Sequence, residues 1–403
     1  MTKRVASLMA GIADVGRDPV RGGYSRPVYS TAELDLRSWF VAEAAARGLE
    51  VEIDRNGVIW AWWDVASGDR TGALVTGSHL DSVPGGGAFD GPLGVASALA
   101  AIDLLRERGA RPDRAVAIAV FPEEEGSRYG VACLGSRILT GAIPIERALA
   151  LKDDDGSTFA ERSRSAGVDP SRMGPDPERL ALIGAFVELH VEQGRGLADL
   201  GHPVAIGSSI LGHGRWRLSF TGQGNHAGTT LMRDRRDPLV AAAGLVAGIP
   251  GLARAHDGAR ATVGRLRPIP GGTNVIASRV DAWLDVRHPD DRVTARLVAE
   301  IAALAEELAA GQGCGVVVRE ESFSPTMSFD AALRRRLETA LPGAPVLETG
   351  AGHDAGVLAA RLPAAMLFVR NPSGVSHSPE EHVEDADAER GAEALAGVLM
   401  GAI

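Results

Sequence analysis

Histidine and carboxylate side chains gather in four short stretches of the sequence. The stretches are GSHLDSVPGGGAFDG (77–91), FPEEEGSRYG (121–130), ELHVEQG (188–194) and GVSHSPEEH (374–382). Imidazole nitrogens and carboxylate oxygens, without cysteine, are a donor set that suits Zn²⁺, Mn²⁺, Co²⁺ or Ni²⁺. If these stretches meet in the fold, they predict a centre that binds divalent metal ions.

The first stretch places His79 and Asp81 directly after the apolar segment 73–77. A carboxylate within reach of an imidazole can hold one ring N–H and so fix which nitrogen points at a metal. Asp90 follows a glycine turn at 85–87 and directly precedes a predicted helix.

The second stretch contains three adjacent glutamates, Glu123, Glu124 and Glu125. Neighbouring carboxylates repel one another unless cations compensate for them. Because side chains of adjacent residues diverge, one glutamate can bind a metal while the next faces a water molecule. A metal-assisted hydrolase needs this combination of a ligand and a general base.

The other two stretches add His190 and Glu192, and then His377 in a loop of Gly, Ser and Pro residues. A single histidine in a loop is more often a surface or structural residue than a ligand. Here each of the four stretches follows a different predicted buried strand, and this coincidence favours one shared site.

Four apolar runs are predicted to be the strands that position these residues. They are 73–77, 115–121, 185–190 and 364–370. Helical patterns, such as 93–108, separate them. Continuous apolar strands alternating with helices predict an α/β domain whose mainly parallel sheet has helices on both faces. Ligands of such sheets bind at the carboxyl ends of the strands.

A different pattern, beginning after residue 208, interrupts this domain. The predicted elements are alternating strands at 214–222 and 279–287, helices at about 237–248 and 291–310, and a closing strand at 315–320. They predict an inserted α+β domain with one solvated sheet face. The predicted boundaries are 1–208 and 324–403 for the α/β domain and 209–323 for the insertion. The polar segment 152–180 is predicted to be a surface excursion.

The insertion has three candidate residues of its own. His226 lies in GQGNHAGTT, Asn274 in GGTNVIASR and Arg287 in DVRHP. Arg287 could clamp a carboxylate with two hydrogen bonds. Alternatively, His226 caps its loop, Asn274 fills a turn and Arg287 forms a surface ion pair. The glycines near His226 do not fit a dinucleotide-binding loop, because no strand–helix–strand unit surrounds them.

Composition excludes several classes of protein. The 403 residues carry 42 Lys and Arg against 52 Asp and Glu, a formal net charge of −10, which argues against a nucleic-acid partner. No apolar run reaches the roughly 20 residues of a membrane span, and the N-terminal residues do not resemble a signal peptide. The two cysteines, Cys133 and Cys314, are predicted to be buried thiols of a cytoplasmic protein.

Taken in order, these motifs identify a resemblance. The chain resembles the metal-dependent M20 amidohydrolases of the hydantoinase/carbamoylase branch, which includes allantoate amidohydrolases, N-carbamoyl-L-amino-acid hydrolases and β-ureidopropionases. The matching stretches are GSHLDSVPGGGAFDGPLGV, FPEEEGSRYG, ELHVEQG, GQGNHAGTT, GGTNVI, DVRHP, GAGHDA and GVSHSPEE. They span about residues 20–385, nearly the whole chain.

The resemblance implies a site with two divalent metal ions. The implied ligands are His79, Asp90 and His190 for one metal, and Asp90, Glu125 and His377 for the other. Asp90 would bridge the two ions. Glu124 would be the general base that takes a proton from a water bound to the metals, and Asp81 would orient His79.

The resemblance also implies substrate contacts by Gln193, His226, Asn274 and Arg287, with His226 as a donor to the developing oxyanion. The insertion would be a lid and dimerisation domain. In the family some of its residues reach the active site of the partner subunit, so a homodimer is expected.

The implied substrate is a small linear ureide that bears a carboxylate, such as allantoate or an N-carbamoyl-L-amino acid. Other N-acyl amino acids, including N-formyl and N-formimino amino acids, fit the same residues. A dipeptide is a further alternative, which His190 disfavours. A catalytically silent ligand-binding relative is the alternative of another class. The complete set of ligands and base argues against that alternative.

Overall fold

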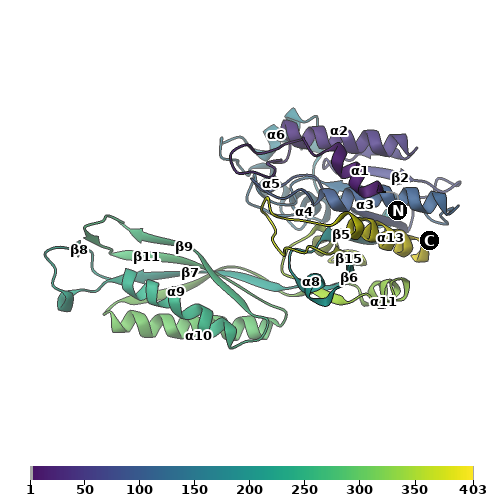
Figure 1. Cartoon of the computed structure of the whole chain (residues 1–403). Helices are drawn as coiled ribbons and strands as arrows, with labels where there is room; N and C mark the ends of the chain where they lie inside the picture. Colours follow the sequence, from purple (N-terminus) through teal and green to yellow (C-terminus); the bar gives the residue numbers. More distant parts are fainter. Residues whose placement is uncertain (1–2, 403) are drawn as a thin grey trace. The chain divides into compact units, whose positions relative to one another are not determined.

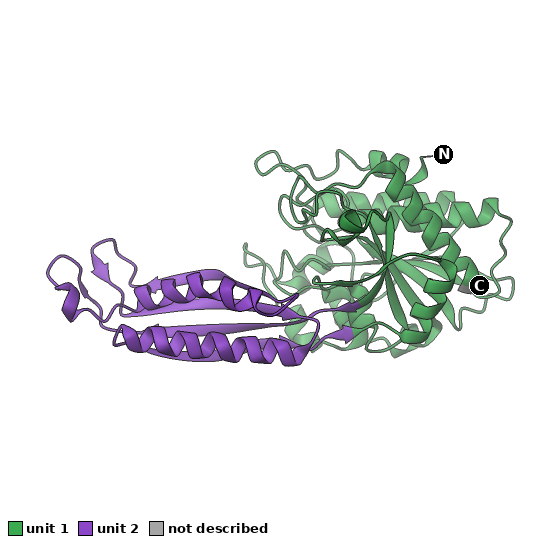
Figure 2. Cartoon of the chain, turned by 60° about the horizontal axis from the view of Figure 1, so that its bottom comes forward, with its two compact units in different colours: residues 1–208, 328–403 green, residues 209–327 purple. Residues whose placement is uncertain are grey.

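The computed structural model describes residues 3–402 (Figure 1). The chain folds into two compact units (Figure 2). Unit 1 consists of the residues up to Ser208 together with those from Ser328 onward, and unit 2 is Ser209–Met327. None of the helices within residues 3–402 is both long and apolar enough to cross a membrane.

Unit 1 is built on a mixed sheet whose order is β1-β2-β4-β3-β5-β15-β6-β13, with β14 paired to β6. The strands are β1 (Glu50–Ile53), β2 (Ile59–Trp63), β3 (Ala73–His79), β4 (Val116–Phe121), β5 (Ile183–Val191), β6 (Val204–Ile210), β13 (Met327–Ser328), β14 (Val346–Thr349) and β15 (Ala364–Val369). The four central strands β4, β3, β5 and β15 run parallel, while β1, β2 and β6 pair antiparallel. The predicted α/β class is confirmed.

The central strands are apolar on both sides because helices cover both faces of the sheet. On one face, Val187, Leu189 and Val191 of β5 pack into the main hydrophobic core. The helices of that core are α1 (Arg4–Gly11), α2 (Thr31–Ala46), α3 (Pro92–Glu107), α11 (Ala331–Ala340) and α13 (Asp385–Ala402). On the other face, the Glu188 carboxylate accepts a hydrogen bond from the Ala355 N–H of α12 (Asp354–Leu358).

The segment 152–180 is more ordered than predicted. It contains α6 (Phe159–Ser165), a 3₁₀ turn (Pro170–Arg172) and the start of α7 (Pro177–Leu182). Phe159, Val168 and Met173 are buried in a second core with residues of α4 (Leu134–Thr140) and α5 (Ile145–Leu149). Most residues of the segment are exposed or half-buried, as expected for a surface excursion, and these few apolar residues anchor it.

Unit 2 is an antiparallel sheet of order β12-β7-β11-β9 with two helices. Its elements are β7 (Gly212–Thr221), α9 (Pro238–Arg254), β9 (Arg260–Ile269), β11 (Arg279–His288), α10 (Asp291–Gly311) and β12 (Gly315–Ser324). Buried and exposed residues alternate along β7. Both helices contribute to the core of the unit, together with apolar residues of the strands. The strand β9 was not predicted. Half of its ten residues, 264–268 (GRLRP), show no clear alternation of buried and exposed side chains.

Candidate metal centre

The predicted ligands lie at or beyond the carboxyl ends of the four parallel strands. His79 is the last residue of β3, and His190 is near the end of β5. Glu125 follows β4 within four residues, and His377 lies in the loop after β15. Because the strands are parallel, their carboxyl ends share one edge of the sheet, and the structure gathers these side chains there.

The first group of potential ligands is His79, Asp90 and His190. Asp90 Oδ1 lies 3.1 Å from His190 Nε2 and 3.4 Å from His79 Nε2. All three side chains are buried. Gly91, with φ +84°, makes this approach possible, since a Cβ there would lie 2.5 Å from the His79 ring.

The second group is Asp90, Glu125 and His377. His377 Nε2 lies 3.4 Å from Asp90 Oδ2 and 3.4 Å from Glu125 Oε2. The Gln193 amide nitrogen donates a hydrogen bond to the same Asp90 Oδ2 at 2.8 Å and lies 3.3 Å from His377 Nε2. Asp90 thus presents one carboxylate oxygen to each group, which is the arrangement of a bridging ligand.

The chemistry of both groups fits divalent cations. Within each group the three donor atoms lie within 4.8 Å of one another. The Nε2 atoms of His79 and His190 are buried and have no hydrogen-bond partner among the described residues. Leaving such atoms unsatisfied is costly, and a metal ion would satisfy them. The nitrogen and oxygen donors suit the first-row metals expected from the sequence.

Burial and mutual charge shift the pKa values of the centre. Burial opposes protonation of His79, but the carboxylates of Glu124, Asp90 and Asp81 outweigh it and raise the pKa of the ring. Burial, followed by the charges of Asp90 and Asp81, raises the pKa of Glu125 to about 8. The low-dielectric site and the like charges destabilise the Glu125 anion, and nearby cations would relieve that cost.

The three adjacent glutamates have three different environments. The Glu123 carboxylate accepts hydrogen bonds from the N–H groups of Arg128 and Tyr129, so it stabilises the loop to which it belongs. Glu125 belongs to the second ligand group. Glu124 is buried, and its Oε2 lies 3.7 Å from His79 Nε2. Glu124 is therefore the glutamate left beside the metal ligands without belonging to either group.

Asp81 contacts His79 mainly through its backbone. The Asp81 carbonyl oxygen lies 3.0 Å from His79 Nδ1, whereas the nearest carboxylate oxygen is 3.8 Å away. The carboxylate instead accepts the N–H groups of Glu124 at 3.2 Å and Glu125 at 3.1 Å. Asp81 thus connects the end of β3 to the glutamate loop after β4.

Glu192, which the sequence offered as a further ligand candidate, is not part of either group. Its carboxylate accepts the N–H groups of Gly196 and Leu197 at the start of α8 (Gly196–Leu200). This is an ordinary capping role, which uses the same carboxylate chemistry as a metal ligand.

His353 is a residue of the centre that the sequence analysis named only within the motif GAGHDA. It is buried, its ring centroid lies 4.5 Å from that of His190, and neither ring nitrogen has a hydrogen-bond partner among the described residues. Burial and the neighbouring histidines hold the pKa of His353 well below its usual value. His353 follows the short strand β14 by four residues and directly precedes α12. The VLET segment that forms β14 is short and half polar, so no strand is predicted there that could point to His353.

Within unit 2, two of the predicted substrate contacts lie together. The short strands β8 (Asn225–His226) and β10 (Val275–Ile276) pair antiparallel, with His226 opposite Val275. The Ala227 N–H donates a hydrogen bond to the Asn274 carbonyl, and the side chains of His226 and Asn274 are exposed.

Arg287 lies towards the other end of unit 2. In β11 it is eight residues after Arg279, which pairs with Thr221 at the end of β7 that leads to His226. At about 3.4 Å per residue, this separates Arg287 from that end of the sheet by roughly 27 Å. The Arg287 guanidinium donates hydrogen bonds to both carboxylate oxygens of Asp285, at 2.7 and 3.1 Å.

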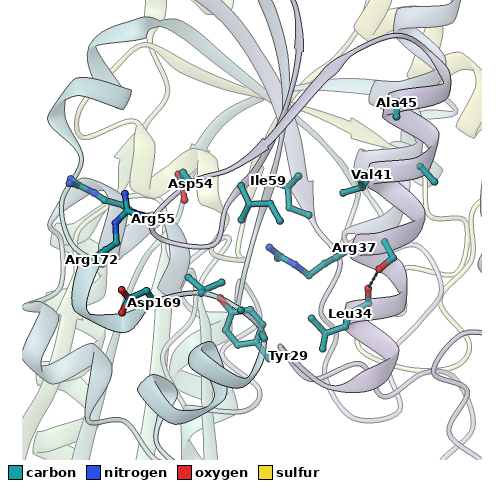
Figure 3. Close-up of a pocket in the computed structure, with 16 residues that line it drawn as sticks. Tyr29, Leu34, Arg37, Val41, Ala45, Asp54, Arg55, Ile59, Asp169 and Arg172 are labelled. Carbon is teal, nitrogen blue, oxygen red and sulfur yellow. Dashed lines mark hydrogen bonds between the residues drawn. The ribbon is translucent and has the colours of Figure 1, made fainter.

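A separate cavity in unit 1, of about 640 Å³, contains none of the predicted ligands (Figure 3). It lies between α2, the β1–β2 connection and residues 166–172. Two of the arginines that line it form ion pairs, Arg37 with Glu33 and Arg55 with Asp176. The potential metal ligands are at the sheet edge and not in this cavity.

The comparisons with known proteins agree with this geometry. Residues 75–401 match the profile of peptidase family M20/M25/M40. The chain belongs to this family. It is 35% identical to an N-carbamoyl-L-amino acid amidohydrolase of Geobacillus stearothermophilus, over 98% of this chain and 96% of that protein. It is 34% identical to an allantoate amidohydrolase of Bacillus subtilis (strain 168), over 94% of this chain and 92% of that protein.

A solved structure of a hydantoinase/carbamoylase family amidase from Burkholderia multivorans has the same fold. The TM-score is 0.87 at 31% identity, and the match covers 99% of this chain and 97% of that chain. The resemblance read from the motifs is therefore confirmed for the family, and the relatives span nearly the whole chain.

Asp81→Asn tests the link between β3 and the glutamate loop. The Glu124 and Glu125 N–H groups donate to different oxygens of Asp81. Asparagine places an NH₂ group at one of these two positions, so one of the hydrogen bonds is lost. We expect metal affinity or activity to fall by about 10- to 100-fold, while the circular dichroism spectrum stays unchanged. Competition with a fluorescent chelator measures the affinity. Asp154→Asn, on the surface, is the control, and an Asp81→Asn protein with unchanged affinity and activity would contradict the role.

Proposed function

We propose that this chain is a binuclear metal hydrolase that cleaves a carbon–nitrogen bond of a linear ureide bearing a carboxylate, such as allantoate or an N-carbamoyl-L-amino acid. The observation that carries the proposal is the position of Asp90, whose two oxygens face two different groups of potential ligands. The amidohydrolase relatives, similar over nearly the whole chain, support the reaction class.

The proposed cofactors are two divalent ions, with Zn²⁺, Mn²⁺, Co²⁺ and Ni²⁺ all compatible with the donors. His79, Asp90 and His190 would hold one ion, and Asp90, Glu125 and His377 the other. Such ions polarise a substrate carbonyl and make water a stronger nucleophile at neutral pH.

Glu124 is the proposed general base. Burial, the largest cause, raises the pKa of its carboxyl well above the usual range. A raised pKa suits a group that takes a proton from the attacking water and delivers it to the leaving nitrogen. The Cys133 thiol donates a hydrogen bond to Glu124 Oε1 at 3.3 Å.

Substrate binding is assigned to polar residues outside the ligand groups. The Gln193 side-chain oxygen is buried without a partner among the described residues, so it can accept a hydrogen bond from a substrate N–H. Arg287 and Asn274 would bind the substrate carboxylate, and His226 would donate to the developing oxyanion. Fixing the substrate at both ends reduces the entropy lost on the way to the transition state.

Unit 2 is the proposed lid and dimerisation domain. Arg287 lies roughly 27 Å along β11 from Arg279, by the strand spacing. Arg279 is at the end of the sheet from which the chain continues to His226. A small substrate cannot contact both residues of one copy of unit 2. If both bind the same substrate, two copies of the chain contribute, which supports a symmetric homodimer.

A substrate panel on metal-stripped protein tests the reaction. We expect added Mn²⁺ or Zn²⁺ to restore cleavage of allantoate or of an N-carbamoyl-L-amino acid, with release of ammonia. N-carbamoyl-β-alanine, N-formyl- and N-formimino-L-glutamate and a dipeptide complete the panel. Cleavage of only the formyl or formimino compounds would exclude the ureide. An inert protein that still binds two metals would favour the silent relative.

Glu124→Gln tests the general base. The amide cannot accept a proton, so we expect kcat to fall by about 10²- to 10⁴-fold, with metal content near that of the wild type. Glu146→Gln, an exposed glutamate of α5, is the matched control. Elemental analysis of the same samples separates loss of the base from loss of metal, and a Glu124→Gln enzyme of normal kcat would rule out the assignment.

Mixing two inactive variants tests the dimer. His226→Ala and Arg287→Ala should each lose most activity. If each site takes Arg287 from one subunit and His226 from the other, a mixed dimer has one intact site, and random exchange should restore about one quarter of wild-type activity. The mixture stays inactive if one subunit supplies both residues, and sedimentation of an active monomer would exclude the dimer.

A further inference from the structure

Glu381 connects the loop of His377 to the segment that carries Asp90. Its side chain is buried, with 5% of the residue exposed. One carboxylate oxygen, Oε1, accepts the N–H groups of Phe89 and Asp90, each at 3.0 Å. The other, Oε2, lies 3.3 Å from the Ser376 hydroxyl, which can donate to it. A single carboxylate therefore contacts both segments.

The turn before Asp90 is shaped to admit this carboxylate. A Cβ at Gly87 would lie 2.3 Å from Glu381 Oε1 and 2.5 Å from Glu381 Cβ, so any larger residue would displace the side chain. The glycine turn at 85–87 thus provides the space in which Glu381 reaches the backbone of Phe89 and Asp90.

The two ligand groups differ in how firmly the fold holds them. In the first group, His79 and His190 lie within strands β3 and β5 and are buried. In the second group, His377 lies in a loop, its side chain is 50% exposed, and its backbone has φ +56°. A left-handed backbone at a non-glycine residue is unfavourable and needs support from its surroundings.

We propose that Glu381 is a positioning residue for the second metal ion: it holds the His377 loop against the Asp90 segment, so that His377 Nε2 and Asp90 Oδ2 face the same ion. The inference rests on the proposed two-metal function and goes beyond it. It assigns a role to a side chain that is not itself in either ligand group. It also predicts that the two metals differ in their dependence on this loop.

The experiment is a metal titration of the full-length, metal-stripped protein with Zn²⁺. Isothermal calorimetry gives the two affinities, and elemental analysis after gel filtration gives the stoichiometry. The wild type should bind two ions. Glu381→Ala should keep the first affinity within about twofold, while the second falls by about 10- to 100-fold, leaving one ion per chain after gel filtration.

Two further variants make the outcome specific. Glu381→Gln keeps an oxygen that can accept the Phe89 and Asp90 N–H groups, so it should retain most of the second affinity. Glu380→Ala removes the neighbouring exposed carboxylate, which contacts only Ser378 among the described side chains, and should bind two ions normally. Thermal unfolding of each variant verifies that it is folded.

Several results would overturn the proposal. They are normal binding of two ions by Glu381→Ala, equal loss of both affinities in folded Glu381→Ala, and a loss in Glu381→Gln as large as that in Glu381→Ala. The last result would mean that charge matters and loop position does not. A wild type that binds fewer than two ions would instead reject the two-metal function itself, and this inference with it.

Discussion

The burial of many ionisable groups at one edge of a sheet is the constraint on which this structure depends. His79, Asp90 and His190 are almost fully buried, and Glu124 is buried beside them. An isolated buried charge is strongly unfavourable, and a buried pair is stable only when its partners are well placed. For Asp90, the attraction of neighbouring groups outweighs the cost of burying its charge. Burial opposes its ionisation, but His190 and His79 lower its pKa well below the usual value.

For Glu123 and Glu125, the cost of burying the charge outweighs the attraction of neighbouring groups. Burial and like charges raise the pKa values of Glu123 and Glu125 to about 8. Glu123 can be satisfied by backbone N–H groups, as it is by those of Arg128 and Tyr129. Glu125 Oε1 accepts the Val83 N–H, and Oε2 faces His377. A cation bound there would neutralise several of the neighbouring carboxylates at once. Glutamate therefore stabilises a loop through backbone hydrogen bonds at position 123 and is a potential metal ligand at position 125.

Backbone-accepting carboxylates recur around the centre, and they account for its precision. Asp81 joins β3 to the glutamate loop, and Glu381 joins the Asp90 segment to the His377 loop. Glu188 accepts the Ala355 N–H on the opposite side of β5. Parallel strands bring their carboxyl ends to one edge but leave the loops beyond them free. These carboxylates fix the loops, so that side chains distant in sequence reach about 3 Å separations.

The sequence predicts much of this arrangement because its strongest signals are long. Continuous apolar runs predict the four central strands to within about two residues, and the histidine and carboxylate motifs after them predict the ligand groups. Shorter or less regular sequence patterns do not predict the structure correctly. The strand β9 and the buried residues of 152–180 were missed, and Glu192 was not distinguished from a ligand. His353 and the backbone contact of Asp81 depend on tertiary packing, which no spacing within one chain segment encodes.

Unit 2 sets a geometric condition on any function that uses its polar residues. Its sheet is long and antiparallel, with ten-residue strands, and His226 and Arg287 are placed near opposite ends. A rigid sheet cannot bring its two ends onto one small molecule, since the strands cannot shorten without losing their ladder of hydrogen bonds. In the proposed homodimer no deformation would be needed if the two sheets paired in antiparallel directions, because opposite ends of the two copies would then lie together. The length of β7 and β11 would then set the distance between the contacts that two subunits make with one substrate.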